Sequence, residues 1–141
     1  GERQISVDCD VLQADGGTRT ASITGGFVAL AIAIAKLAKD GTIPPKVLRE
    51  AVAATSVGYV ADDLRLDLVY QEDSKAEVDL NLVATKSGAI VEVQGTAEGA
   101  PIPRKDVDRM IDLGLAGIAE LVQRQERTLA SAGVDLAKHL L

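Results

Sequence analysis

Residues 20–39 form an almost uninterrupted apolar segment that ends at Asp40 and Gly41, a usual place for a helix to stop. Because nearly every position is apolar, the pattern predicts a central helix that is buried on most sides. Aromatic residues make up only 2% of the chain, so the core around this helix must consist of Val, Leu, Ile and Ala. The fold must therefore enclose one long aliphatic helix.

The rest of the chain alternates between strand and helix patterns. Apolar and polar residues alternate with the period of a half-buried strand in residues 4–11, 64–70 and 78–84, and residues 52–60 and 89–94 are also expected to be strands. Residues 105–129 show helical spacing, and a short helix is expected over residues 46–51 after two prolines. Residues 1–141 are therefore expected to form a single α+β domain. Its mixed sheet is covered on one face by the buried helix and the long C-terminal helix.

A glycine-rich loop precedes the apolar helix. Gly16 and Gly17 lead into Thr18, Arg19 and Thr20, and the helix begins at once. Free N–H groups at a helix N-terminus and the helix dipole favour a bound anion, and a guanidinium suits phosphate. The alternative is an ordinary loop that a threonine hydroxyl caps, with the arginine in solvent. The pattern alone leaves both interpretations open.

Asp73 and Asp79 are a second candidate pair. On one straight strand they would lie about 20 Å apart at ~3.3 Å per residue, too far to share a metal ion. They can converge only if the segment between them, residues 72–77, folds back, and its Asp-Ser-Lys composition favours a turn. Two converging carboxylates could hold a hydrated Mg²⁺ or act as a general acid. The alternative is that both are solvated acids at a loop and a strand edge.

Composition and charge exclude several classes of function. The net charge of −6 and the scarcity of aromatic residues argue against a nucleic-acid binder that uses its whole surface. The longest apolar run, residues 27–35, is too short for a bilayer, and no secretory signal is visible. The lone Cys9 is expected to be a buried strand thiol, and a cytoplasmic protein without a membrane partner follows as the default.

Four stretches of the chain resemble ribonuclease PH. They are residues 1–26 (GERQISVDCDVLQADGGTRTASITGG), 66–85 (LDLVYQEDSKAEVDLNLVAT), 91–99 (VEVQGTAEG) and the C-terminal helix. The resemblance covers essentially all of this chain and roughly the C-terminal half of the family's subunit. It implies a fold similar to the second domain of ribosomal protein S5. It also implies a phosphorolytic 3′→5′ exoribonuclease that forms hexameric rings.

The family trims the 3′ ends of tRNA with inorganic phosphate as co-substrate, and the products are nucleoside diphosphates. By motif, Gly17, Thr18 and Arg19 match its phosphate-binding loop, with Thr20 adjacent. Asp73 and Asp79 match the acidic pair expected to bind Mg²⁺ and, with Arg19, to assist catalysis. Asn81 lies where polynucleotide phosphorylase has a lysine.

The chain departs from the family in lacking the N-terminal half of the subunit and its tRNA-binding arginines. The missing half could be a separate partner chain that completes the enzyme, or it could have been lost by cleavage or deliberately deleted. The alternative is an isolated, catalytically inactive half-subunit or engineered module that self-associates through exposed apolar surface and sheet edges.

Overall fold

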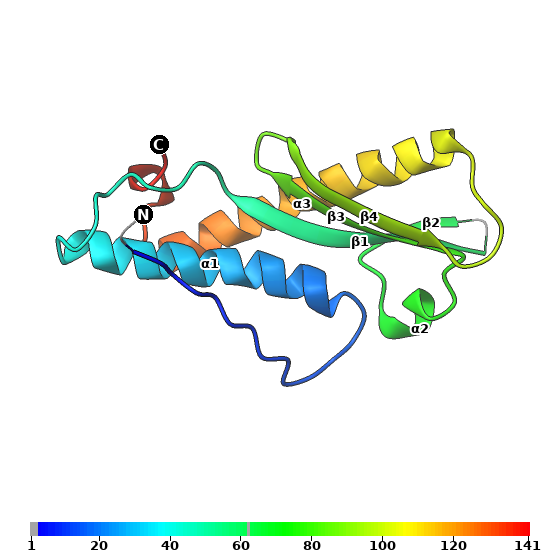
Figure 1. The fold of residues 1–141 in the computed structure, drawn as a ribbon, viewed down its shortest axis with the longest axis horizontal. Helices are drawn as coiled ribbons and strands as arrows, with labels where there is room; N and C mark the ends of the chain where they lie inside the picture. Colours follow the sequence, from blue (N-terminus) through cyan, green and yellow to red (C-terminus); the bar gives the residue numbers. More distant parts are fainter. Residues whose placement is uncertain (1–2, 62) are drawn as a thin grey trace.

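The computed structural model describes residues 3–61 and 63–141, and Figure 1 shows their arrangement. The elements are, in chain order, helix α1 (Thr18–Lys39), strands β1 (Val52–Val60) and β2 (Asp63–Leu66), helix α2 (Tyr70–Asp73), strands β3 (Val78–Thr85) and β4 (Ile90–Ala97), helix α3 (Arg104–Ser131) and the 3₁₀ turn η1 (Leu136–Lys138). The predicted α+β class is confirmed. Two of the predicted elements, residues 4–11 and 46–51, are wrong.

The sheet has four strands in the order β2-β1-β3-β4, and all three pairings are antiparallel. It is therefore not the mixed sheet expected from the sequence. Parallel neighbours need a long crossover connection, and no helix of more than one turn lies between the strands. In β3, Val78, Leu80, Leu82 and Ala84 are buried as predicted, whereas Asp79 and Asn81 point to the opposite face.

α3 covers the face of the sheet that carries Leu80 and Leu82. Two glycines allow its close approach, as the sequence suggested. A Cβ on Gly114 would lie 2.7 Å from Leu82 Cδ2, and one on Gly117 would lie 2.9 Å from Leu66 Cδ1. The predicted long helix is confirmed, with bounds one or two residues wider.

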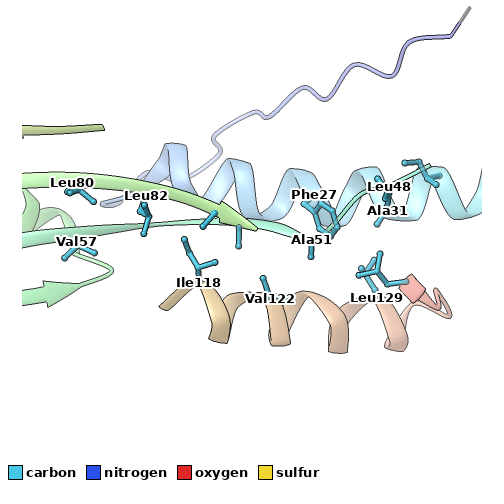
Figure 2. Close-up of a cluster of buried hydrophobic side chains, with 14 of the residues drawn as sticks. Phe27, Ala31, Leu48, Ala51, Val57, Leu80, Leu82, Ile118, Val122 and Leu129 are labelled. Atoms are coloured by element: carbon cyan, nitrogen blue, oxygen red, sulfur yellow. The ribbon is translucent and has the colours of Figure 1, made fainter. Parts of the chain in front are cut away.

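α1 and α3 pack against each other beyond the end of the sheet. Figure 2 shows Phe27 and Ala31 of α1 on one side of this core and Leu129 of α3 on the other. The expectation that α1 is buried on most sides is wrong. Only one stripe of the helix is buried (Thr20, Phe27, Ala31 and Ile34), and Ile32 on another side is 41% exposed. The N-terminal segment lies along another side of the helix (Figure 1).

A buried polar junction fixes α1 against the edge of β1. The hydroxyl of Thr24 donates to the Ala54 carbonyl (3.1 Å) and accepts the Ala54 N–H (3.0 Å). Gln125 of α3, only 3% exposed, donates to the carbonyls of Thr24 (2.9 Å) and Val52 (3.0 Å). These bonds satisfy the stretch of β1 that β2 does not reach, so three elements are joined at one point.

Residues 4–11, predicted as a strand, are extended but have no strand partner in the described ranges. The segment lies along α1 instead. A Cβ on Gly26 would lie 3.3 Å from Val7 Cγ1. Cys9, predicted to be buried, is exposed, and its Sγ is 3.7 Å from the Ser22 carbonyl. The alternating pattern therefore predicted neither the burial of these apolar side chains nor a pairing partner, because pairing needs a neighbouring strand.

Three smaller predictions also differ. Residues 46–51 are not a helix, because the N–H groups of Val47 and Leu48 donate to the carbonyl of His139 near the C-terminus. The strand predicted over residues 64–70 stops at Leu66, where Asp67 adopts a φ of 57°. Gly58 is not a bulge, since the register runs through it unbroken. The turn predicted at residues 61–63 includes Asp62, which lies outside the described residues.

α1 is long and apolar enough to cross a membrane by length and composition, with a mean hydropathy of 1.8 in its most apolar window. A helix from the core of a soluble protein meets the same criterion, and α1 does contribute Phe27, Ala31 and Ile34 to the core. Its composition therefore assigns no membrane role.

Replacing Gln125 with leucine tests the polar junction. The change keeps the volume but leaves the Thr24 and Val52 carbonyls without their buried donor, so the free energy of unfolding should fall by about 2–4 kcal/mol. Urea unfolding followed by circular dichroism measures it. Gln123→Leu, at an exposed position of the same helix, is the matched control. Equal midpoints for both variants would contradict the role of the junction.

Candidate active site

The glycine loop ends in a helix start that has free donors. Gly17, with a φ of 70°, occupies the N-cap position of α1, and no side chain caps this end. No acidic residue lies in the first turn either. The first N–H groups of the helix, from Thr18 to Thr20, therefore remain available to an anion, as the phosphate-site interpretation requires. The alternative of a threonine-capped loop is not what the structure shows.

Thr20 is hydrogen-bonded to the glycine loop. Its side chain is buried, and its hydroxyl donates to the Gly17 carbonyl at 2.9 Å. A Cβ on Gly17 would lie 3.0 Å from this hydroxyl, and its positive φ also favours glycine. Because the Thr20 hydroxyl proton is already used, this residue can offer an anion only its backbone N–H.

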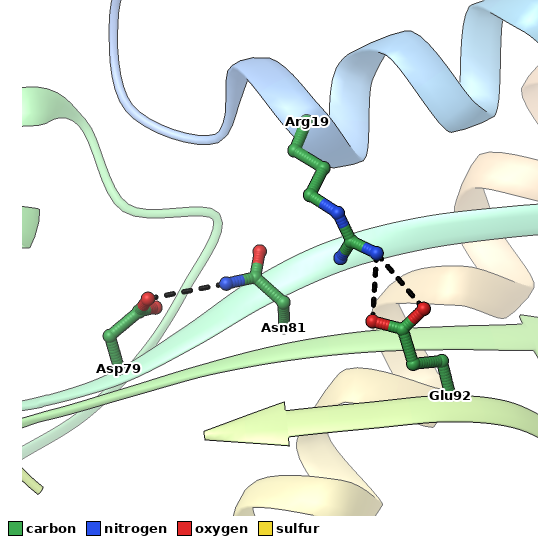
Figure 3. A network of polar contacts seen from close by, with 4 residues as sticks. All are labelled: Arg19, Asp79, Asn81 and Glu92. Carbon is green, nitrogen blue, oxygen red and sulfur yellow. Dashed lines mark hydrogen bonds and ion pairs between the residues drawn. The ribbon is translucent and has the colours of Figure 1, made fainter. Parts of the chain in front are cut away.

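Arg19 projects from the first turn of α1 over the sheet, where it meets Glu92 of β4 (Figure 3). Its Nη2 lies 2.7 Å from Glu92 Oε1 and 2.9 Å from Oε2, and both side chains are about half exposed. A half-exposed pair of this kind contributes about 0–1 kcal/mol, so another anion can compete for the guanidinium. The sequence analysis did not predict a role for Glu92. Its place among the alternating residues of β4 was the available signal that its side chain lies on this face.

The acidic segment folds back as convergence of Asp73 and Asp79 requires. After β2 the chain turns, and the buried side chain of Leu68 packs over Gly58, where a Cβ would lie 2.3 Å from Leu68 Cδ2. Gly58 and Asp79 are paired neighbours on the face opposite α3. α2 follows, and Arg65 of β2 binds Glu72 of this helix at 2.6 Å. α2, which ends with Asp73, is thereby held at the sheet.

Asp79 has a raised pKa. Burial raises the pKa of its carboxyl, and the charge of Asp73 raises it further, against the opposing effect of a hydrogen bond from Asn81. Asn81 Nδ2 donates to Asp79 Oδ2 at 3.2 Å, as Figure 3 shows. The other oxygen, Oδ1, is buried and has no hydrogen-bond partner among the residues that the structure describes. Such a carboxylate favours a cation or a proton.

The two acids fit a magnesium ion that keeps most of its water. No group of three or more His, Cys, Asp or Glu side chains in the described ranges could hold a metal ion. Mg²⁺ in phosphate-handling sites commonly uses one or two carboxylates, with water and phosphate oxygens as its other ligands. The unpartnered Oδ1 of Asp79 and the nearby charge of Asp73 match that donor set.

These features share one face of the molecule. Arg19 at the helix start, Asp79 and Asn81 lie on the side of the sheet away from α3. The charge of Asp73, at the end of α2, acts on Asp79. N–H donors, a guanidinium and two carboxylates are the groups expected of the class of proteins that carries out phosphate chemistry with a bound metal ion.

Comparison with known sequences agrees with this class. The model of the 3′ exoribonuclease family, domain 2, matches residues 50–117, which include Asp73, Asp79, Asn81 and Glu92. The chain belongs to the ribonuclease PH family.

Its relatives resemble it over nearly its whole length. It is 55% identical over 132 residues to ribonuclease PH of Neisseria meningitidis, which covers 94% of this chain and 54% of the relative. It is 57% identical to ribonuclease PH of Saccharopolyspora erythraea, over 93% of this chain and 53% of the relative. The chain thus spans about half the length of the curated relatives that it matches.

A solved structure shows the same fold. The crystal structure of rice (Oryza sativa) Rrp46 superposes with a TM-score of 0.66, over 84% of this chain and 51% of the rice chain. The sequences are 21% identical, so this similarity concerns the fold alone.

Replacing Asp79 with asparagine should remove Mg²⁺ binding and stabilise the metal-free protein at neutral pH. The raised pKa of Asp79 means that the fold penalises the charged form. Stability should therefore fall as pH rises from the ordinary aspartate pKa to the raised one, and Asp79→Asn should lack this loss. Mg²⁺ affinity should increase over the same interval, since the ion displaces a proton.

Thermal melts between pH 4 and pH 8, with and without Mg²⁺, measure both effects. Asp112→Asn, an exposed acid on α3, is the control and should behave like the unmodified protein. A Mg²⁺-dependent rise in melting temperature that persists in Asp79→Asn would reject the assignment.

Proposed function

We propose that this chain carries the phosphate-binding and acidic groups of a phosphorolytic 3′→5′ exoribonuclease that trims tRNA 3′ ends. The observation that carries the proposal is one shared face, on which Arg19 and the uncapped start of α1 lie with Asp79 and Asn81. The similarity to ribonucleases PH over more than nine-tenths of the chain supports it.

In the proposed reaction an oxygen of inorganic phosphate attacks the phosphorus of the last phosphodiester bond of the RNA. The new bond forms as the bond from phosphorus to the 3′ oxygen of the preceding nucleotide breaks. The products are a nucleoside 5′-diphosphate and an RNA one nucleotide shorter, whose 3′ oxygen takes up a proton from water. Gly17, Thr18, Arg19 and Thr20 hold the attacking phosphate close to an anionic backbone that would otherwise repel it.

Asp73 and Asp79 would hold Mg²⁺, which when bound offsets negative charge on the transferring phosphoryl group. Asn81 orients Asp79 through its 3.2 Å hydrogen bond. Arg19 leaves Glu92 for the phosphate, so the incoming anion replaces one that is already present.

The proposed assembly includes residues beyond this chain. The chain covers about half of each curated relative, and its net charge is −6. A companion N-terminal half is therefore proposed to deliver the tRNA, and a ring of six subunits in the cytoplasm is the proposed working form.

A second candidate is an inactive module that self-associates. The exposed side of α1 and the unpaired residues 4–11 favour it, because Ile5, Val7 and Val11 are each more than 40% exposed. The mass of the chain in solution and its activity together decide between the candidates.

Replacing Arg19 with alanine should lower kcat/KM for phosphate by roughly 100-fold or more, because a charge-assisted contact to the attacking anion is lost. The assay follows nucleoside diphosphate release from a tRNA with an extended 3′ end, in phosphate and Mg²⁺. It uses the chain alone and the chain mixed with the N-terminal half of the Neisseria meningitidis relative.

Arg127→Ala, an exposed arginine in the C-terminal half of α3, should leave the rate unchanged. Equal phosphate dependence of the Arg19 and Arg127 variants would refute the role of Arg19. No diphosphate release from either preparation, with the chain self-associated, would favour the inactive module.

A further inference from the structure

Asp15 connects two loops that lie far apart in the sequence. Its side chain is exposed, yet one oxygen, Oδ1, accepts both the Gly16 N–H at 2.8 Å and the Tyr70 N–H at 2.7 Å. The first donor belongs to the glycine loop, and the second is the first residue of α2. A single carboxylate oxygen therefore joins the start of the proposed phosphate site to the helix that ends with Asp73.

The backbones on either side of this bridge are in direct contact. A Cβ on Gly16 would lie 2.1 Å from the Leu68 carbonyl oxygen and 3.0 Å from the Val69 carbonyl carbon. Leu68 is itself buried over Gly58, so the chain beneath the glycine loop is anchored to the sheet. The glycine loop thus rests on the segment that leads into α2, and Asp15 fastens the two together.

The chemical identity of the bridge also argues for a positional role. A carboxylate beside an anion site repels the anion, so this residue type is unfavourable here unless its contacts offset the repulsion. The N–H of Tyr70, and then that of Gly16, lower the pKa of Asp15, so it stays ionised and a strong acceptor at neutral pH. Sequence reasoning assigned Asp15 no role.

We infer that Asp15 is a positioning residue that holds the phosphate-binding loop and α2 at a fixed separation. Phosphate bound at residues 17–20 and the acids Asp73 and Asp79 then act on the same phosphodiester. The inference rests on the proposed function, and Asp15 itself touches no substrate.

Three variants test the inference in the phosphorolysis assay. Asp15→Ala removes the acceptor and should lower kcat/KM for phosphate about 10–100-fold, with a raised KM, because a small displacement of a reacting group is costly. Asp15→Asn keeps an acceptor oxygen and should remain within about threefold of the unmodified protein. Asp10→Ala, an exposed acid in the same N-terminal segment, should have no effect.

A second readout does not depend on activity. Amide hydrogen exchange of Gly16 and Tyr70, measured by NMR on the chain, should be about tenfold faster in Asp15→Ala and unchanged in Asp10→Ala. Thermal melts show whether each variant is folded. A loss of folded protein lowers kcat at constant KM, whereas a displaced loop raises the KM for phosphate.

The outcomes separate the two proposals. If the unmodified protein releases no diphosphate, the proposed function fails. The hydrogen exchange of the Gly16 and Tyr70 amides still decides whether Asp15 joins the loops. Unchanged exchange at Tyr70 in Asp15→Ala overturns the inference, whatever the activity. Faster exchange with unaltered phosphate kinetics overturns it as well, because the loops would then be joined without consequence for the site.

Discussion

The buried junction of Thr24, Ala54 and Gln125 fixes the position of α1, and with it the glycine loop, against β1 and α3. A strand whose edge is only partly paired must satisfy its remaining backbone groups, and here two side chains from two helices do so. Because Thr24 is less than two turns from the start of α1, the same bonds place the glycine loop over the sheet. The position of the proposed phosphate site is thus a consequence of how β1 completes its hydrogen bonding.

The site is then assembled from loops that rest on that frame. Gly58 leaves room for Leu68, Leu68 carries the chain into α2, and Gly16 packs on the backbone of Leu68. The two charged parts of this face differ. Arg19 is paired with Glu92, whereas Oδ1 of Asp79 has no hydrogen-bond partner among the described residues. In the proposed function, one half of the site exchanges one anion for another and the other half accepts a cation.

Periodicity predicted the elements whose burial is decided locally. α1 was indicated by its continuous apolar run, β3 and α3 by the spacing of their apolar residues, and Gly114 and Gly117 by their place in a helical pattern. β1 and the turn between β3 and β4 were also predicted. The strand predicted over residues 4–11 was wrong because an alternating pattern does not specify which strand pairs with it. The helix predicted over residues 46–51 was wrong because backbone N–H groups of this segment donate to the distant carbonyl of His139. The contacts of Asp15 and Glu92 span 55 and 73 positions of the chain, a separation that local patterns do not report.

β3 carries the core and the chemistry on alternate residues. Leu80 and Leu82 face α3, while Asp79 and Asn81 face the site. Deleting or inserting one residue within this strand would move Asp79 into the aliphatic core and turn Leu80 outward. A change of length that keeps this arrangement must therefore fall in the turn at residues 86–88 or in the loops. Substitutions at even-numbered positions of β3 must preserve packing against α3, and those at odd-numbered positions must preserve the face that carries Asp79 and Asn81.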